Sequence, residues 1–164
     1  MRIQKRRRRE GKTDYLSRLK LLKGKLPRLV LRKTNRYVLA QYVTSKEAQD
    51  KIELEVSSKK LLKYGWPKEA QGGLKSTTAT YLTGILIGKK ILSEKKKTPI
   101  IDFGMVRKLH KSKVFAFLKG VIDSGVKIKA EEKKEIFPAE DRIEGKHLKH
   151  KIPFQEIKSK IEKQ

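Results

Sequence analysis

The amino-acid sequence predicts a single α/β domain, with the order βββαβα and helices packed on a mixed sheet. Short runs rich in β-branched and aromatic residues precede the first long helical pattern, and Gly and Pro mark the boundaries. A length of 164 residues suits one compact domain with tails. We expect a basic arm over residues 1–12, the domain over 13–126 and a charged C-terminal extension over 127–164.

The N-terminal arm is dominated by positive charge, with six Lys or Arg among the first nine residues. Like charges side by side disfavour a compact state, so we expect the arm to be disordered when alone. Thr13 or Asp14 can then cap a short helix, which Gly24 and Pro27 end. We expect this helix to dock by its apolar side and to show its cations. The apolar residues are Tyr15, Leu16, Leu19 and Leu22.

Three strands in a meander are predicted next. The runs RLVLRK and RYVLAQYVT are joined at Thr34 and Asn35, where Asn tolerates the left-handed backbone of a tight hairpin turn. Both faces of the second run carry apolar residues, which favours a central position for that strand. In KIELEVSS, Ile52, Leu54 and Val56 alternate with charged residues, the pattern of a strand with one wet face.

A helical turn over residues 59–64 and a loop over GWPKEAQGG lead to a long helix that Thr77 or Thr78 opens. Gly84 and Gly88 share one face of this helix, which fits the close approach of a backbone or a sheet. The apolar residues at helical spacing are Ala79, Leu82, Ile85, Leu86 and Leu92.

The last part of the predicted domain is a short buried strand, TPIIDFGMV, and a helix capped by Ser112 and ended at Gly125. Its inward residues are expected to be Val114, Phe115, Leu118, Val121 and Ile122. The tail is expected to lie across the domain without extending its core. Phe154, Ile157 and Ile161 indicate an amphipathic turn or two near its end.

Net charge restricts the class of partner. The chain has 43 Lys and Arg against 18 Asp and Glu, a formal charge of +25. Such a density repels itself unless a polyanion neutralises it, which favours the phosphate backbone of a nucleic acid over an anionic membrane surface. We find no signal peptide and no apolar run near the roughly 18 residues of a spanning helix, so a soluble intracellular protein is expected. The lack of cysteine excludes disulfides and thiolate metal sites.

Possible catalytic and metal motifs are weak. In GILIGKK, three residues separate the glycines and Lys90 stands where a P-loop needs Ser or Thr, so helix packing explains it better. His147 and His150 lack a third ligand nearby and have lysine neighbours. Asp102 and Asp123 have no nucleophile or base beside them. We therefore expect no enzyme activity, cofactor, metal or small-molecule substrate.

The combination of a basic arm, a cationic helix and cations around one hairpin favours RNA binding. Guanidinium groups bind phosphate bidentately, and Tyr37 can either stack on a base or belong to the core. The residues expected to bind RNA are Arg2, Lys5, Arg6, Arg7, Arg8, Arg9, Lys12, Thr13, Tyr15, Arg18, Lys20, Lys23, Arg28, Arg32, Lys33, Thr34, Asn35, Arg36, Tyr37, His110, Lys111, Lys113, Lys146 and His147.

The stretch RRRREGKTDY closely resembles the N-terminus of the archaeal and eukaryotic type of large-subunit ribosomal protein eighteen, a 5S rRNA-binding family. Further blocks agree in order and spacing: RLVLRKTNRYVLAQ, LLKYGW, ATYLTGILIGKK, IDFGMVRKLHKSKVFAFLKGVIDSG and PAEDRIEGKHL. The resemblance runs from about residue 5 to about residue 148. One departure is Leu16, where relatives often have a basic residue.

This resemblance implies a structural, non-catalytic role in the cytoplasm. The family binds 5S rRNA and docks it on large-subunit rRNA in the central protuberance, beside neighbouring ribosomal proteins. It also implies that the hairpin tip, Thr34 to Arg36, reaches 5S rRNA. From the residues themselves we expect the junction to anchor the arm to the domain, with Thr13 and Asp14 capping the helix and Gly11 allowing the turn. A basic RNA- or DNA-binding protein outside the ribosome, and an RNA-processing enzyme, are the alternatives.

Overall fold

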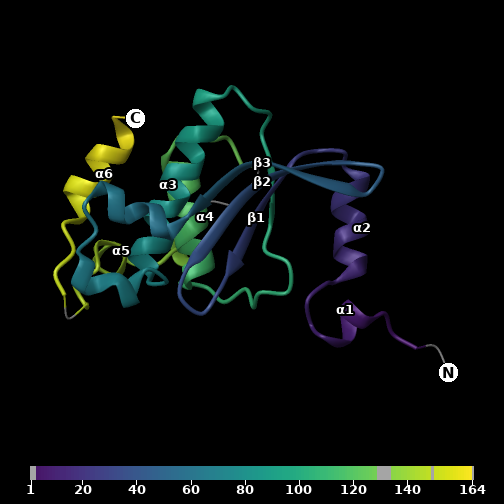
Figure 1. Ribbon diagram of the computed structural model, residues 1–164, viewed down its shortest axis with the longest axis horizontal. Helices are drawn as coiled ribbons and strands as arrows, with labels where there is room; N and C mark the ends of the chain where they lie inside the picture. The colour runs from purple at the N-terminus through teal and green to yellow at the C-terminus, as the bar shows by residue number, and fades with distance from the viewer. Residues whose placement is uncertain (1–2, 129–133, 149, 164) are drawn as a thin grey trace.

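A mixed β-sheet forms the centre of the structure (Figure 1). The computed structural model describes residues 3–128, 134–148 and 150–163, and within them the strand order is β3-β2-β1-β4. The first three strands are an antiparallel meander, and β4 pairs with β1 in parallel, so the predicted mixed sheet and interior second strand are confirmed. The bounds are β1 Arg28–Lys33, β2 Val38–Lys46, β3 Gln49–Ser57 and β4 Ile100–Asp102.

Most helices gather at one end of the sheet. Helix α3 packs against β2 and β3, and α4 packs against α3. Figure 1 shows α3 to α6 at one end of the molecule and α1 and α2 at the other. The α-helices are α1 Arg6–Arg9, α2 Tyr15–Lys23, α3 Thr77–Ser93, α4 Lys113–Asp123, α5 Glu140–Glu144 and α6 Phe154–Glu162; the 3-10 helices are η1 Ser58–Tyr64, η2 Lys68–Gly73 and η3 Lys134–Ile136. None of the helices in the described ranges is both long enough and apolar enough to cross a membrane.

Helices α3 and α4 approach so closely that only glycine fits at their contact. A Cβ built on Gly84 would lie 2.5 Å from the carbonyl oxygen of Phe117, and one on Gly120 would lie 2.2 Å from that of Tyr81. Both neighbouring atoms are backbone, so they cannot move aside as a side chain would. The expected close approach at Gly84 is confirmed, but the neighbour is helix α4 and not the sheet.

The capping and turn predictions are correct in some places and wrong in others. Ser76, one residue before the predicted start, caps α3 by accepting from the Ala79 amide at 3.2 Å. The β1–β2 turn contains no left-handed Asn35; instead the Thr34 hydroxyl accepts from the Tyr37 amide and donates to its carbonyl oxygen. The left-handed turn of the meander lies between β2 and β3, at Glu47 and Ala48, with φ of 51° and 64°.

A bulge explains why Ile52 does not face the core with Leu54. Tyr42 pairs with Leu54, but its neighbour Val43 pairs with Ile52, so β3 has one extra residue there. Since adjacent residues of β2 face opposite sides of the sheet, the bulge turns Ile52 to the side opposite Leu54. Ile52 is 49% exposed.

Other elements differ from the predictions in detail. In α4 the fully buried aromatic residue is Phe117, whereas Phe115 and Ile122 are half-buried, and Leu92 at the end of α3 is exposed. Strand β4 is half-buried because it forms an edge of the sheet. The predicted loop GWPKEAQGG contains η2, which the buried Trp66 stabilises by donating from Nε1 to the Ala70 carbonyl at 3.0 Å.

The C-terminal extension contributes to the core, contrary to the prediction. Phe154, Ile157 and Ile161 of the predicted amphipathic segment form the buried side of α6, which packs on α3 and η1. Ile143 of α5 is also buried, and the Phe154 ring lies 5.8 Å from that of Tyr81. The expectation failed because α3 is apolar nearly all round and needs cover on the side away from the sheet.

The α3–α4 contact predicts the effect of one added methyl group. We expect Gly84→Ala to lower the free energy of unfolding by about 1–3 kcal/mol, although alanine favours helix by about 1 kcal/mol, because its Cβ meets a backbone carbonyl. Denaturant unfolding measures the change. Gly72→Ala is the control, because no atom lies within 4 Å of its Cβ position. Equal stability of the two variants would contradict the close contact.

Candidate nucleic-acid interface

The junction between the arm and the domain is built from short-range polar contacts. Helix α1 is a single exposed turn in the arm, where no helix was predicted. Gly11 turns the chain with φ of 63°, and Asp14 caps α2 by accepting from the Leu16 amide, as expected. Thr13 does not cap the helix; its hydroxyl accepts from Arg7 Nε at 2.9 Å. That the arm is disordered without a partner stays a prediction.

Two further contacts hold the arm beside α2. Arg8 pairs with Asp14 at 3.2 Å, and Lys5 Nζ lies 4.7 Å from the centre of the Tyr15 ring. This cation–π geometry covers the tyrosine ring with a side chain of the arm. Tyr15, expected to meet RNA, is therefore already half-buried against Lys5.

Helix α2 does not dock by its leucines, so that prediction is wrong. None of its residues is buried, and Leu16 and Leu19 are 72% and 53% exposed. A cleft of about 790 Å³ lies here, lined by residues of α2, the sheet and the segment after β4. Arg18 links the helix to the β2–β3 hairpin, pairing with Asp50 at 2.9 Å and donating to the Ala48 carbonyl at 3.4 Å.

Arg28 is buried and paired, so it is not offered to a polyanion. Its residue exposure is 3%, and its guanidinium lies between the carboxylates of Asp102, at 2.9 Å, and Asp50, at 2.6 Å. It also donates to the Ser45 hydroxyl at 3.2 Å. An arginine on an interior strand must be paired in this way because an unpaired buried charge is costly. The expectation that Arg28 contacts RNA is corrected accordingly.

Asp50 joins α2 and β1 through one carboxylate. Burial alone would raise the pKa of Asp50, but hydrogen bonds from Ser45, Arg18 and Arg28 and the charge of Arg28 outweigh that effect. The pKa of Asp50 therefore lies below its ordinary value. This carboxylate stabilises the folded chain above the unfolded pKa, and that stabilisation is lost as the pH falls through the folded pKa.

The tip of the β1–β2 hairpin is a compact exposed group. Three hydrogen bonds between Thr34 and Tyr37, at 2.8 to 2.9 Å, hold the turn in one shape. Tyr37 is half-buried and packs against the core, so it supports the turn and its ring is not fully offered for stacking. Residues 32 to 36 are all exposed.

Three lysines from separate segments converge beside this hairpin. Burial lowers the pKa of Lys113, at the start of α4, and the charges of Lys33 and Lys75 lower it further. Figure 1 shows the β1–β2 turn and the segment leading into α4 at the same lower edge of the molecule. Among the described ion pairs none involves these three residues. The sequence analysis missed Lys75, because a single lysine before a helix carries no signal of its own.

The remaining predicted RNA-binding residues have different surroundings. His110 and Lys111 are exposed beside α4, with the His110 ring edge-on to Phe115 at 5.9 Å. Lys146 is exposed but already pairs with Asp141 and Glu144, whose hydrogen bonds raise its pKa. Arg2 lies outside the described residues. The predicted residues that are exposed are Lys5, Arg6, Arg7, Arg8, Arg9, Lys12, Lys20, Lys23, Arg32, Lys33, Thr34, Asn35, Arg36, His110, Lys111, Lys146 and His147.

The weak catalytic and metal motifs have structural explanations. Asp102 ends β4 and pairs with Arg28, while Asp123 ends α4 and accepts from the Tyr81 hydroxyl at 2.6 Å. GILIGKK lies inside α3 and not on a strand-to-helix turn. In the part of the chain that the structure describes, no three His, Asp or Glu side chains form a group that could hold a metal.

Comparison with known proteins shows which family the chain belongs to. The family of ribosomal large subunit proteins 60S L5 and 50S L18 matches residues 1–100. The chain belongs to this family. Family members are structural constituents of the large ribosomal subunit and not enzymes, and this chain shares that role.

Archaeal family members resemble the chain over most of its length. The large ribosomal subunit protein uL18 of Korarchaeum cryptofilum is 44% identical over 143 residues, covering 87% of this chain and 70% of the relative. That of Methanoregula boonei is 41% identical, covering 87% and 79%. That of Methanospirillum hungatei is 38% identical, covering 90% and 81%.

The Asp50 network predicts a pH-dependent loss of stability. We expect Asp50→Asn to lower the free energy of unfolding at pH 7 by about 1–3 kcal/mol, because the buried Arg28 loses a charged partner. The difference from the wild type should shrink as the pH falls and the wild-type Asp50 is protonated. Denaturant unfolding at pH 7 and at a series of lower pH values measures this difference in the free energy of unfolding.

The matched control is Asp141→Asn, which removes an equally close but exposed ion pair with Lys146. It should change stability at pH 7 by less than about 1 kcal/mol. If both variants behaved alike at every pH, the Arg18–Asp50–Arg28 network would not hold α2 and the sheet together.

Proposed function

We propose that this chain binds 5S rRNA and docks it on large-subunit rRNA in the central protuberance, beside other ribosomal proteins. The observation that carries the proposal is the convergence of Lys33, Lys75 and Lys113 at the hairpin tip. Their mutual repulsion costs free energy in the isolated chain, and a phosphate backbone at this edge would remove that cost.

The arm and the hairpin have different tasks in this proposal. Helix α1 buries no residue, so its exposed arginines are accessible to phosphates where a folded domain has no room. The hairpin tip is held by the Thr34 hydrogen bonds and stands on an interior strand, so its groups keep a fixed arrangement. A fixed arrangement of cations and amides can distinguish one RNA shape from another, whereas the exposed arginines of the arm mainly add affinity.

Deleting residues 1–9 tests the contribution of the arm. The deletion removes six cations, and none of its described residues, 3–9, is buried, so we expect an unchanged melting temperature and weaker binding to 5S rRNA. The slope of log affinity against log salt should flatten by up to ~4–5 units if all six meet phosphates. Fluorescence titration over a salt series measures the affinity and its salt slope. Unchanged affinity and slope would show that the arm takes no part in RNA binding.

Alanine substitutions at Arg32, Asn35 and Arg36 test the hairpin. We expect a modest change in salt slope but a larger loss of preference for 5S rRNA over tRNA, because these residues present a fixed shape. The control Lys127→Ala/Lys151→Ala removes the same number of charges from exposed positions elsewhere. A preference reduced equally by both variants would mean that the hairpin supplies charge alone.

A further inference from the structure

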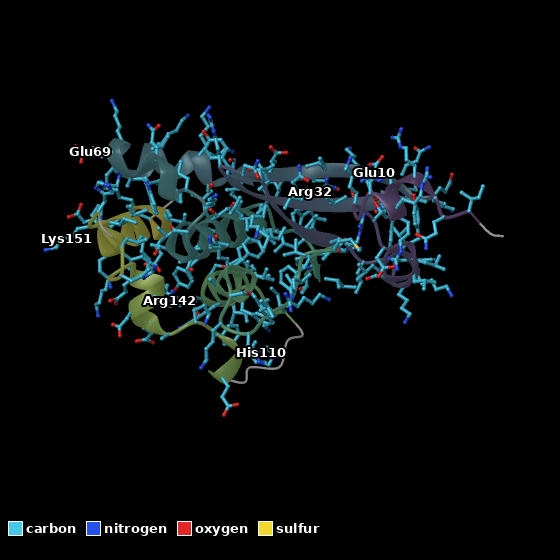
Figure 2. The ribbon with its side chains drawn as sticks, turned by 90° about the horizontal axis from the view of Figure 1, so that it is seen from below. Glu10, Arg32, Glu69, His110, Arg142 and Lys151 are labelled. Atoms are coloured by element: carbon cyan, nitrogen blue, oxygen red, sulfur yellow. The ribbon has the colours of Figure 1, made fainter. Side chains whose placement is uncertain are left out.

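The cleft beside α2 is lined both by the arm and by the strand that leads to the hairpin tip. Arg7 and Lys12 line it from the arm, and Arg32 and Lys33 line it from the end of β1. All four side chains are exposed. Along the length of the molecule in Figure 2, Arg32 lies between Glu10 of the arm and the far end. The arm and the hairpin therefore border one cleft.

The interior of the cleft is apolar and aromatic. Val30 and Val43 are buried on this side of the sheet, and Ile52, which the bulge turns to the same side, is 49% exposed. Tyr15 and Phe103 also line the cleft and are half-buried. The volume of about 790 Å³ lies within the range of about 300–1,000 Å³ that small-molecule sites have.

The charges inside the cleft cancel one another. Arg28 pairs with Asp50 at 2.6 Å and with Asp102 at 2.9 Å, and Arg18 pairs with Asp50 at 2.9 Å; all four residues line the cleft. A phosphate group at this depth would meet two carboxylates. The interior therefore suits an uncharged group, whereas the exposed cations around it suit phosphates.

Tyr15 can stack on a second flat group. Lys5 Nζ lies 4.7 Å from the centre of its ring. A cation occupies one face of an aromatic ring, so the opposite face remains for stacking. Unstacked RNA bases commonly stack on aromatic side chains in this way.

We propose that this cleft binds one unstacked nucleobase of RNA, while the exposed cations around it bind the phosphates on either side of that nucleotide. A nucleobase is flat and uncharged, which matches the apolar interior, and its phosphates match Arg7, Lys12 and Arg32. The proposal rests on the proposed function, because it names how RNA is held between the arm and the hairpin.

The test compares two probes of equal charge on the full chain. One is an end-labelled RNA of eight adenine nucleotides, and the other is the same ribose–phosphate chain without bases. Fluorescence anisotropy measures the affinity for each. We expect the wild type to bind the RNA with bases on the order of tenfold more tightly, because stacking adds to the phosphate contacts. Equal affinity for the two probes would overturn the proposal.

A matched pair of variants locates the base. Ile52→Gln makes the cleft interior more polar and should remove most of the tenfold advantage. Leu19 is equally exposed, at 53%, but lies outside the cleft, so Leu19→Gln should keep the advantage. An equal loss by both variants would mean that the bases do not use the cleft.

Two substitutions at Tyr15 test the stacking. Tyr15→Phe keeps the ring and should keep the ratio of the two affinities, whereas Tyr15→Leu should lower that ratio severalfold. The ratio compares two probes on the same protein, so it does not depend on the folded fraction. If Tyr15→Leu kept the wild-type ratio, the ring would only hold Lys5, and the proposed stacking would be wrong.

Competitors separate the possible occupants of the cleft. If adenosine monophosphate displaced the labelled RNA as readily as unlabelled RNA does at equal nucleotide concentration, the occupant would be a free nucleotide. If poly-glutamate did so, the occupant would be an acidic polypeptide. Either result would overturn the proposal, and we expect neither.

Binding of 5S rRNA and tRNA, measured on the same protein, separates this proposal from the proposed function. A wild type that prefers 5S rRNA but binds both probes equally would keep the proposed function and overturn the base cleft. A wild type that distinguishes the probes but not the two RNAs would support the cleft and contradict the proposed function.

Discussion

Surplus positive charge is the constraint on which the organisation of this molecule depends. The net charge is +25, and some of the acids pair with a cation that would otherwise be buried without a partner. Arg28 forms ion pairs with two carboxylates because it lies on an interior strand, and Lys146 forms ion pairs with two carboxylates on the surface. Other cations, such as Arg32, Lys33 and Arg36 at the hairpin tip, are exposed and have no ion pair among the described residues, and a polyanion would relieve their repulsion.

Dense packing at one end of the molecule stabilises the fold and so offsets this repulsion. Helices α3 and α4 meet through Gly84 and Gly120 at backbone contact, and α6 covers the remaining apolar side of α3. The other end is different, because α2 buries nothing and is linked to the sheet through Arg18 and Asp50. The molecule therefore combines a densely packed part with a cationic segment that is held by polar contacts.

The order and type of the main elements could be predicted because periodicity, caps and turn residues are local signals. The surroundings of individual side chains could not be predicted in this way. The leucines of α2 are amphipathic in pattern, but periodicity does not show whether a partner surface exists, and Leu16 faces solvent. The partners of Arg28 lie 22 and 74 positions away, and the convergence of Lys33, Lys75 and Lys113 depends on three segments meeting in space. Neither relation is present in any local stretch of sequence.

The most direct test of this account is the melting temperature of the chain, free and bound to 5S rRNA, as a function of salt. If unrelieved repulsion limits the free chain, its melting temperature rises as salt screens the like charges. If RNA phosphates relieve that repulsion, the complex melts higher at low salt, and its advantage falls as salt increases. A free chain whose melting temperature is constant or falls with salt, or a complex whose advantage does not depend on salt, would contradict the account.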